Sequence, residues 1–183
     1  RLIIGTFPTH QDNYKNTFEF YYAGEKNRFW DVINEVFKPD FKYFKGREAI
    51  KEREDFFSKN GIGITDMHEK CWRRNKSSLD KDLYPIILTD VFKILKEINT
   101  IKTIILTSRT GPMSALGLFR TYFMQQNRNL VDSVEDIFRI KRTEFEFEGR
   151  VIKVLVPHST SSTNDKVTMS QLIAMYKKCL RDE

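Results

Sequence analysis

Three short apolar runs, each ended by a turn residue, constrain most strongly what this chain can fold into. They cover residues 2–5, 62–65 and 101–107, and segments with the 3.6-residue period of an amphipathic helix separate them. Short, continuously apolar strands that alternate with helices are typical of a parallel sheet buried on both faces. A fourth run, residues 151–156, follows an alternating stretch at 145–147 across a Glu-Gly turn, which predicts a hairpin and an antiparallel edge strand.

The segments between these runs have the caps and apolar faces of helices. One amphipathic pattern begins after Asn27 and ends before Pro39, and a second repeats over 87–98. Pro112 suits the first turn of the next helix, and Tyr176 lies on the apolar face of the last one. The order of elements predicts an α/β fold, a three-layer α/β/α sandwich with a central, mostly parallel sheet of about four strands plus an antiparallel edge strand.

Composition favours one domain over residues 1–183 that folds without cross-links. The chain is 40% hydrophobic, and a domain of this length buries enough surface to need neither disulfides nor a structural metal. Cys71 and Cys179 have neither CxxC nor metal-ligand spacing, so we expect free thiols, no metal and no cofactor. No apolar run reaches the length of a membrane span, and no signal-peptide pattern opens the chain. We expect a cytoplasmic protein, nucleoid-associated in a bacterium, with no membrane partner.

Charge and missing motifs narrow the classes of function. Thirty-one Lys and Arg against 25 Asp and Glu give a net charge of +6, which suggests a polyanionic partner without establishing one. The chain contains no GxGxxG, GxxxxGK[ST] or GxSxG pattern, and no HxE followed by CxxC. Dinucleotide enzymes, P-loop nucleoside triphosphatases, serine hydrolases and zinc deaminases are therefore disfavoured.

Polar loops follow the carboxyl ends of the predicted strands. They cover residues 5–10, 66–68, 108–111 and 157–164, and short hydroxyl side chains dominate the last of them. Ligands of open α/β sheets usually bind at this edge. The sequence therefore predicts the functional site there.

Three segments in and near these loops form a specific pattern: GTFP at 5–8, YYAGEKNRFW at 21–30 and PHSTS at 157–161. Together with GIGITD at 61–66 and SLD at 78–80, they resemble the uracil-DNA glycosylase superfamily. The hypoxanthine-DNA glycosylases are most similar, followed by the mismatch-specific uracil/thymine DNA glycosylases. The resemblance implies a monofunctional DNA glycosylase that flips out a modified or deaminated base and hydrolyses its N-glycosidic bond, leaving an abasic site.

The resemblance also implies roles for single residues. Tyr22 falls where the family stacks an aromatic ring on the flipped base, and His158 could donate a hydrogen bond to that base. Thr9 stands where uracil-specific relatives have a bulky tyrosine, so we expect room for a purine or an enlarged pyrimidine. The expected base-binding set is Gly5, Thr6, Phe7, Pro8, Thr9 and Tyr22. The side chains expected to contact DNA phosphates are those of Ser159, Ser161, Ser162, Arg73, Arg74 and Lys76.

This chain lacks the family's water-activating residue at both of the positions where the related enzymes carry it. Phe7 stands where the uracil and mismatch enzymes have Asp or Asn, and Thr89 stands where the hypoxanthine type has Asn. The candidates to replace them are Asp12, Asp66 and Asp90. Asp66 is preferred because it closes a strand at the carboxyl edge of the sheet, and the catalytic set is Asp66, His158 and Asp12.

Two other functions remain open at this point. A catalytically inactive nucleic-acid-binding module on the same fold would account for Phe7 and Thr89. An unrelated α/β enzyme for a small phosphorylated ligand would use the serine-rich loop as its anion site. We expect DNA, duplex or single-stranded with a modified base, as the partner, and a monomer as the oligomeric state.

Overall fold

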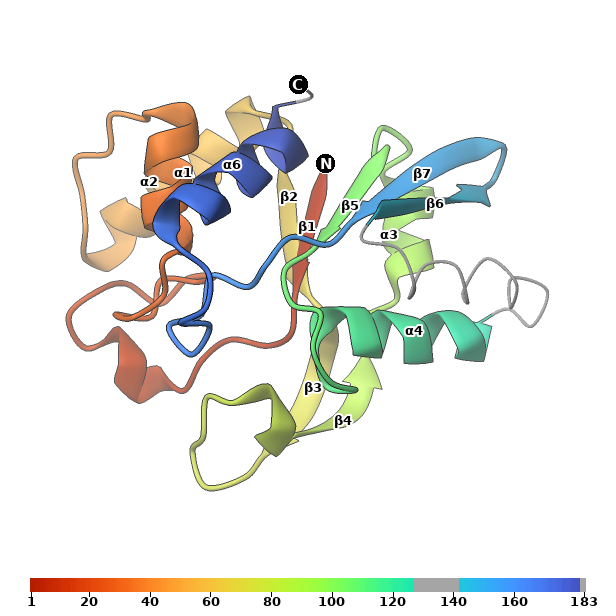
Figure 1. Cartoon of the computed structure of the whole chain (residues 1–183), viewed down its shortest axis with the longest axis horizontal. Coiled ribbons are helices and arrows are strands. Elements are labelled where there is room, and N and C mark those ends of the chain that lie inside the picture. Colours follow the sequence, from red (N-terminus) through yellow and green to blue (C-terminus); the bar gives the residue numbers. More distant parts are fainter. Residues whose placement is uncertain (127–141, 182–183) are drawn as a thin grey trace.

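A central sheet of five strands organises the chain in the computed structural model, which describes residues 1–126 and 142–181 (Figure 1). The strand order is β2-β1-β5-β7-β6. All neighbouring pairs are parallel except β6–β7, which is antiparallel. The bounds are β1 (Leu2–Gly5), β2 (Gly63–Asp66), β5 (Thr103–Leu106), β6 (Arg142–Phe147) and β7 (Arg150–Leu155). The α/β class and the mostly parallel sheet with an antiparallel edge strand are confirmed.

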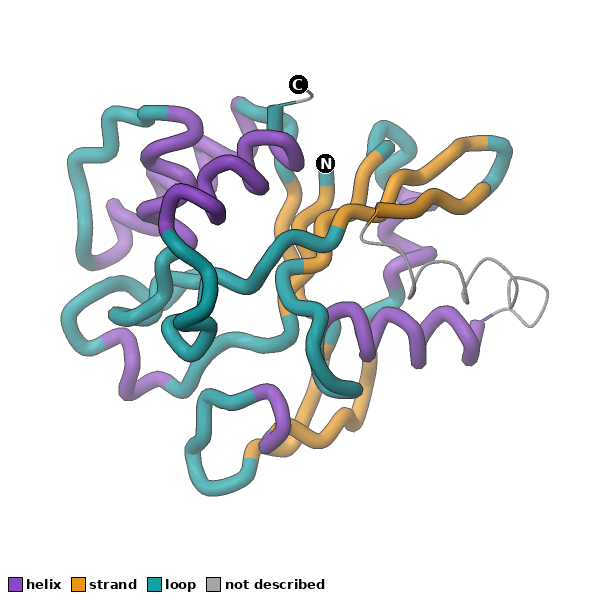
Figure 2. Tube along the Cα trace, in the orientation of Figure 1, coloured by secondary structure: helices purple, strands orange, loops and turns teal. Residues whose placement is uncertain are grey.

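Helices lie on both sides of this sheet (Figure 2). One group packs on the face that Ile3 and Ile105 contribute to, and it consists of α1 (Phe29–Phe37), α2 (Gly46–Lys59) and α6 (Met169–Leu180). The other group packs on the face of Ile4 and Ile104, and it consists of α3 (Val91–Glu97) and α4 (Ala115–Gln126). Successive side chains of a strand point to opposite faces, so continuously apolar strands feed two separate cores. This explains why the central strands lack an alternating pattern.

The predicted helix over 87–98 is wrong in its first part. Ile87 lies in strand β4 (Leu83–Leu88), which pairs antiparallel with β3 (His68–Arg73) to form a separate two-stranded ribbon. Helix α3 begins only at Val91, after Asp90 caps it by accepting a hydrogen bond from the Lys93 N–H at 3.0 Å. The apolar residue at 87 matched the helical period by coincidence, because the proline at position 85 and the β-branched residues after it suit a strand better than a helix.

The ribbon projects from the main body beyond the carboxyl edge of the central sheet (Figure 1). The loop between its strands contains the short 3₁₀ helix η2 (Asp80–Asp82), and a second 3₁₀ helix, η1 (Gln11–Tyr14), lies in the loop after β1. Within residues 1–126 and 142–181, no helix has the length and apolar composition needed to cross a membrane.

Candidate active site

A cavity of about 650 Å³ lies at the carboxyl edge of the sheet. The loops that follow β1, β5 and β7 line it, together with the end of β2, residues 21–27 and the loop that joins β3 to β4. Binding pockets for small ligands commonly have volumes of about 300–1,000 Å³. The cavity therefore occupies the edge that the sequence predicts, and it is large enough for a nucleotide.

Three carboxyl residues line this cavity, and two of them, Asp66 and Asp80, have raised pKa values. Asp66 ends β2 and is buried, and Asp80 begins η2 in the ribbon loop. Burial raises the pKa of Asp66 to about 7, and the nearby negative charge of Asp80 adds to the effect. Burial also raises the pKa of Asp80 to about 6, although a hydrogen bond from Thr6 Oγ1 at 3.2 Å and the positive charge of Arg73 oppose the shift. Carboxyl groups with pKa values near neutrality can exchange protons at physiological pH.

The raised pKa of Asp66 predicts how stability changes with pH. The pKa of Asp66 is about 7 in the folded protein, and that of an aspartate in an unfolded chain is about 4. Between these two pH values the carboxyl is mostly protonated in the folded protein and mostly ionised in the unfolded chain. The free energy of unfolding should therefore fall as the pH rises from about 4 to about 7. Relative to wild type, Asp66→Asn should gain on the order of 4 kcal/mol at most by pH 8 and little at pH 4. Urea unfolding of both proteins across this range measures the difference, and parallel curves would contradict the buried position of Asp66.

Gly5 leaves the space that the Asp66 carboxyl group and the Tyr22 hydroxyl group occupy. A Cβ atom at Gly5 would lie 2.2 Å from Asp66 Oδ1 and 2.3 Å from the hydroxyl oxygen of Tyr22. Real Cβ atoms do not approach other atoms so closely, so a larger residue at the end of β1 would displace Asp66, Tyr22 or the strand end. The sequence predicts a base-binding role for Gly5, and in the structure the absence of a side chain lets Asp66 and Tyr22 approach the strand end.

Tyr22 lines the cavity in a fixed position. Its ring stacks on Phe29 with centroids 4.5 Å apart, and its hydroxyl hydrogen-bonds with Thr107 Oγ1 at 2.9 Å. Its backbone φ is +58°, in the left-handed region that a tyrosine adopts only at a cost of about 1–3 kcal/mol. Strain of this kind is often found at functional sites, where the surrounding contacts hold it in place.

The hydroxyl-rich loop after β7 is held from behind by Asn27 and Arg28. The Arg28 guanidinium donates to the carbonyls of Val167 and Asn164 at 2.8 Å and to that of Ser161 at 3.3 Å. Asn27 Oδ1 accepts hydrogen bonds from the Thr160 hydroxyl at 2.8 Å and from a backbone N–H at the start of α1. The two residues belong to the segment that carries the family resemblance, but the sequence predicted only a helix cap for Asn27 and no role for Arg28; in the structure Arg28 is the N-cap residue of α1. Their contacts span more than 130 positions, which no local pattern reveals.

Arg109 is a further cavity residue that sequence reasoning missed. It follows β5, and its Nη2 lies 2.6 and 2.7 Å from the two ring nitrogens of His158. A guanidinium stays charged at every physiological pH, so this contact brings a permanent positive charge to the cavity beside His158. The signal that could have found it is its place in the polar loop at the end of a central strand.

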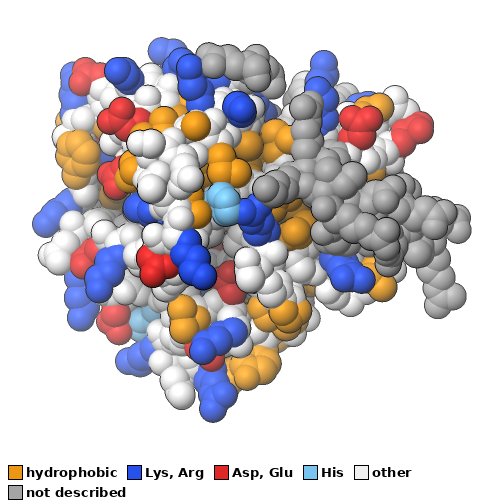
Figure 3. Space-filling view, viewed as in Figure 1, with side chains coloured by type: hydrophobic (Ala, Val, Ile, Leu, Met, Phe, Trp, Pro, Cys, Tyr) orange, Lys and Arg blue, Asp and Glu red, His pale blue; other side chains and the backbone are white. Residues whose placement is uncertain are grey.

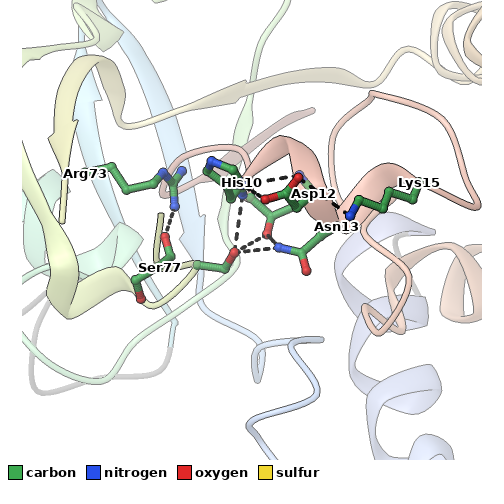
Figure 4. Close-up of polar contacts among 8 residues, drawn as sticks. His10, Asp12, Asn13, Lys15, Arg73 and Ser77 are labelled. Carbon is green, nitrogen blue, oxygen red and sulfur yellow. Dashed lines mark hydrogen bonds and ion pairs between the residues drawn. The ribbon is translucent and has the colours of Figure 1, made fainter. Parts of the chain in front are cut away.

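The predicted base- and phosphate-binding loops meet at the cavity. Gly5 does not line the cavity but adjoins Asp66 and Tyr22. The predicted residues that line it are Thr6, Phe7, Pro8, Thr9, Tyr22, His158, Ser159, Ser161 and Ser162. The Thr9 hydroxyl donates to Ser78 Oγ at 2.6 Å and accepts from Asn13 Nδ2 at 2.8 Å, so the loop after β1 is joined to the ribbon loop (Figure 4). The structure therefore brings together residues from opposite ends of the chain.

Two of the candidate carboxylates lie elsewhere among the described residues. Asp12 is exposed in η1, where its carboxylate lies 3.2 Å from His10 Nδ1 and 3.9 Å from Lys15 Nζ (Figure 4). Asp90 caps α3 and accepts a hydrogen bond from the Tyr122 hydroxyl at 2.6 Å. Neither of them lines the cavity, and Asp80, which sequence reasoning did not consider for catalysis, lies there instead.

The predicted basic contacts also differ in their surroundings. The Arg73 guanidinium donates to the backbone carbonyl of Ser77 (Figure 4). It also donates to the carbonyl of Pro8, so it fastens the ribbon loop to the loop after β1. Arg74 and Lys76 are exposed on the ribbon loop, outside the cavity lining in the described chain. Arg73 therefore has a structural role, whereas Arg74 and Lys76 have their side chains in solvent.

Phe7 and Thr89, which replace the family's polar residues, support the site through packing and backbone contacts. Phe7 lies edge-on to the ring of His68 with centroids 6.0 Å apart. His68 is buried, both of its ring nitrogens lack a hydrogen-bond partner in the described part of the chain, and burial lowers its pKa. Thr89 Oγ1 donates to the carbonyl of Asp66 at 2.6 Å and so fixes the end of β2.

Neither metal-ligand geometry nor similarity to known proteins adds to this description. Over residues 1–126 and 142–181, no three His, Cys, Asp or Glu side chains lie together as a metal site would require. A comparison with models of protein families found no match, and neither did a comparison with curated protein sequences. The resemblance to the uracil-DNA glycosylase superfamily therefore rests on the motif residues of the sequence alone.

Proposed function

We propose that this protein is a DNA glycosylase that flips a modified or deaminated nucleotide into the cavity and hydrolyses its N-glycosidic bond. The observation that carries the proposal is a pair of carboxyl groups with raised pKa values, the buried Asp66 and the half-buried Asp80, in a nucleotide-sized cavity. The helices on both faces of the sheet are consistent with the three-layer α/β/α sandwich of the superfamily. We treat the chain as one such domain.

Base recognition falls to Tyr22 and the loop after β1. Extrusion of a nucleotide from the duplex costs a few kcal/mol, which stacking and hydrogen bonds to the flipped base must recover. Phe29 covers one face of the Tyr22 ring, so the flipped base would stack on the part that lines the cavity. Thr9 is small and its hydroxyl is turned to Ser78, which leaves room for a purine or an enlarged pyrimidine.

Asp66 is the group that would activate water. In hydrolysis the bond between C1′ and the base nitrogen breaks, the base leaves with the electron pair, and a water oxygen bonds to C1′ of an oxocarbenium-like sugar. The water then transfers a proton to the Asp66 carboxylate. A pKa of about 7 makes this carboxylate a better proton acceptor than an ordinary aspartate, while a large fraction remains ionised at neutral pH.

Arg109 and His158 would stabilise the departing base. Negative charge develops on the base as the bond breaks, and fixed donors in a site that excludes water stabilise such charge strongly. The Arg109 guanidinium in contact with His158 supplies a positive charge at the cavity wall. The hydroxyls of Ser159, Ser161 and Ser162 would hold the phosphates that flank the flipped nucleotide.

Incubation with defined oligonucleotides tests the proposal. The substrates are duplex and single-stranded DNA carrying uracil, hypoxanthine, xanthine, a thymine mismatch or a bulky 5-substituted cytosine, and alkali cleavage reports abasic sites. We expect base release from at least one substrate, and release that is slower by about 10²-fold or more with Asp66→Asn at equal protein concentration. Salt-dependent DNA binding without abasic sites would indicate the inactive binding module. Absence of DNA affinity would favour the enzyme for a small phosphorylated ligand, with the serine-rich loop at the cavity as its anion site.

Removal of the Tyr22 ring should weaken base recognition. Stacking of a base on an aromatic ring is worth about 1–3 kcal/mol, so Tyr22→Ala should lower kcat/KM by roughly tenfold or more. Tyr22→Phe keeps the ring and loses only the hydrogen bond with Thr107, so it should retain most activity. Single-turnover rates with the preferred substrate measure both. Equal losses in the two variants would show that the hydroxyl, and not the ring, matters.

A further inference from the structure

The β3–β4 ribbon carries an exposed pair of aromatic rings. Trp72 and Tyr84 are cross-strand partners, their ring centroids are 5.3 Å apart, and they are 56% and 46% exposed. Further apolar side chains of the ribbon and its loop are also exposed, namely Leu79, Ile86 and Ile87. A group of exposed apolar side chains on one element usually marks a binding surface, because leaving it in water costs free energy. The catalytic proposal makes no use of this surface.

The charges around the rings match a polyanion. Residues 69–84 contain five basic and three acidic side chains, and one of the three, Asp80, faces the cavity with a raised pKa. Arg74 and Lys76 are exposed on the adjoining loop, and Lys70 is exposed on β3 itself. Figure 3 shows hydrophobic and basic side chains side by side over the end of the molecule where Figure 1 places the ribbon. Aromatic rings interleaved with cations are typical of surfaces that bind single-stranded nucleic acid.

The two rings lie on the part of the ribbon that leads into the cavity wall. The pair lies at the loop end of the ribbon, one residue pair before the turn, and the loop beyond it places Ser78 to Lys81 in the cavity wall. Arg73 lies next to Trp72 in the chain and fastens the ribbon loop to the loop after β1. The rings therefore lie at the end of the ribbon that continues into the braced loop of the cavity wall.

We propose that Trp72 and Tyr84 form a stacking platform for unpaired bases of the DNA strand whose nucleotide enters the cavity. The inference rests on the proposed function and specifies the preferred substrate as DNA that is single-stranded or locally unpaired. Paired bases in a duplex expose only their edges, whereas an unpaired base offers a face to an aromatic ring. The exposed cations beside the rings contact the backbone, so the platform accepts strands of any sequence.

Tryptophan fluorescence provides a direct test on the intact chain. The protein has two tryptophans, and Trp30 is only 9% exposed with its indole N–H bonded to the Tyr21 carbonyl, so Trp72 is the one that a ligand can reach. Titration with an oligothymidylate of about 12 nucleotides should quench the emission of wild type. Trp72→Phe should bind with similar affinity by fluorescence anisotropy of labelled DNA, with the quenching lost.

A double variant and a matched control measure the energetic role of the platform. Trp72→Ala with Tyr84→Ala should weaken binding of the oligothymidylate by about tenfold or more. Tyr43→Ala removes another aromatic ring that is 50% exposed, on the connection between α1 and α2, and should leave the affinity unchanged. Equal affinity in wild type and the double variant would overturn the inference. A blue shift of Trp72 emission that depends on protein concentration without DNA would also overturn it, because a second copy of the chain would then cover the rings.

The test separates the platform from the catalytic proposal. Base release from a single-stranded substrate is measured on the same variants, and the double variant should lose efficiency through a raised KM with kcat retained. Base release that is identical in wild type and the double variant would refute the platform and leave the glycosylase proposal intact. Absence of base release from every substrate, combined with weaker oligothymidylate binding by the double variant, would refute the glycosylase and support the platform.

Discussion

Asp66→Asn should lower the rate of base release by about 10²- to 10⁴-fold, the range in which a positioned proton acceptor contributes to catalysis. The amide has nearly the same shape as the carboxyl group but cannot accept the proton of the attacking water. Because Asp66 is buried at the end of β2 and holds no charge on the protein surface, the variant should fold and bind DNA as wild type does. Single-turnover rates with saturating protein separate the chemical step from binding.

A matched control and a pH profile sharpen this expectation. Asp12→Asn changes a carboxylate that is exposed in η1 and should leave the rate within a factor of about two, a change of less than 0.5 kcal/mol. In wild type the rate should rise with pH through about 7, as Asp66 ionises. Asp80→Asn removes the neighbouring negative charge, so the pKa of Asp66 should fall and this rise should move to lower pH. A rise that stays in place would show that Asp66 and Asp80 do not interact.

Gly5→Ala should reduce activity by about 10²-fold or more, because displacement of catalytic groups by about 1 Å can cost that much. The added methyl group would collide with Asp66 Oδ1 and with the Tyr22 hydroxyl, and both belong to the proposed machinery. Relief of the clash must move a side chain or the strand end, which should also lower stability by about 1–3 kcal/mol. Activity and thermal unfolding of the purified variant measure the two effects.

Gly63→Ala is the control for this substitution. Gly63 begins the adjacent strand β2, and a Cβ there would meet only the flexible end of Leu2 at 3.3 Å and a carbonyl at 3.7 Å. It should therefore retain activity. Wild-type rates in Gly5→Ala would contradict the close approach of Asp66 and Tyr22 to β1. Equal losses in both variants would indicate that the strands tolerate no side chain, whatever it faces.

The central sheet was predictable because each of its buried strands can be recognised from its own residues. Each of the buried strands is a short apolar run ended by a turn residue, and the position of a loop after such a run places it at one edge of the sheet. The ribbon could not be recognised in the same way. Strand β3 reads HEKCWR and is largely exposed, so it has neither an apolar run nor an alternating pattern. Its pairing with β4 depends on contacts that the sequence pattern does not show.

The site was predictable only in part, for a related reason. Asp66 and Tyr22 adjoin segments with a strong pattern, and the structure brings both to the cavity. Asp80 enters it because Arg73 and Ser78 fasten the ribbon loop to the loop after β1, which is a tertiary contact. Asp12 was a candidate from the sequence, but the 3₁₀ turn directs its carboxylate to His10 and solvent.

The contacts of Arg28 orient the peptide groups of the hydroxyl-rich loop after β7. The carbonyls of Ser161 and Asn164 point to the guanidinium, and those of Ser159 and Thr160 accept from Asn164 Nδ2 and from the Arg28 backbone N–H. In a trans peptide the N–H points opposite to the carbonyl, so the next residues direct their N–H groups away from Arg28. Peptide N–H groups with this orientation can donate hydrogen bonds to an anion, so we expect the backbone of the loop to add to the anion binding of its hydroxyl groups. Because neither a peptide N–H nor a guanidinium titrates at physiological pH, this backbone contribution should be the same at acidic and alkaline pH.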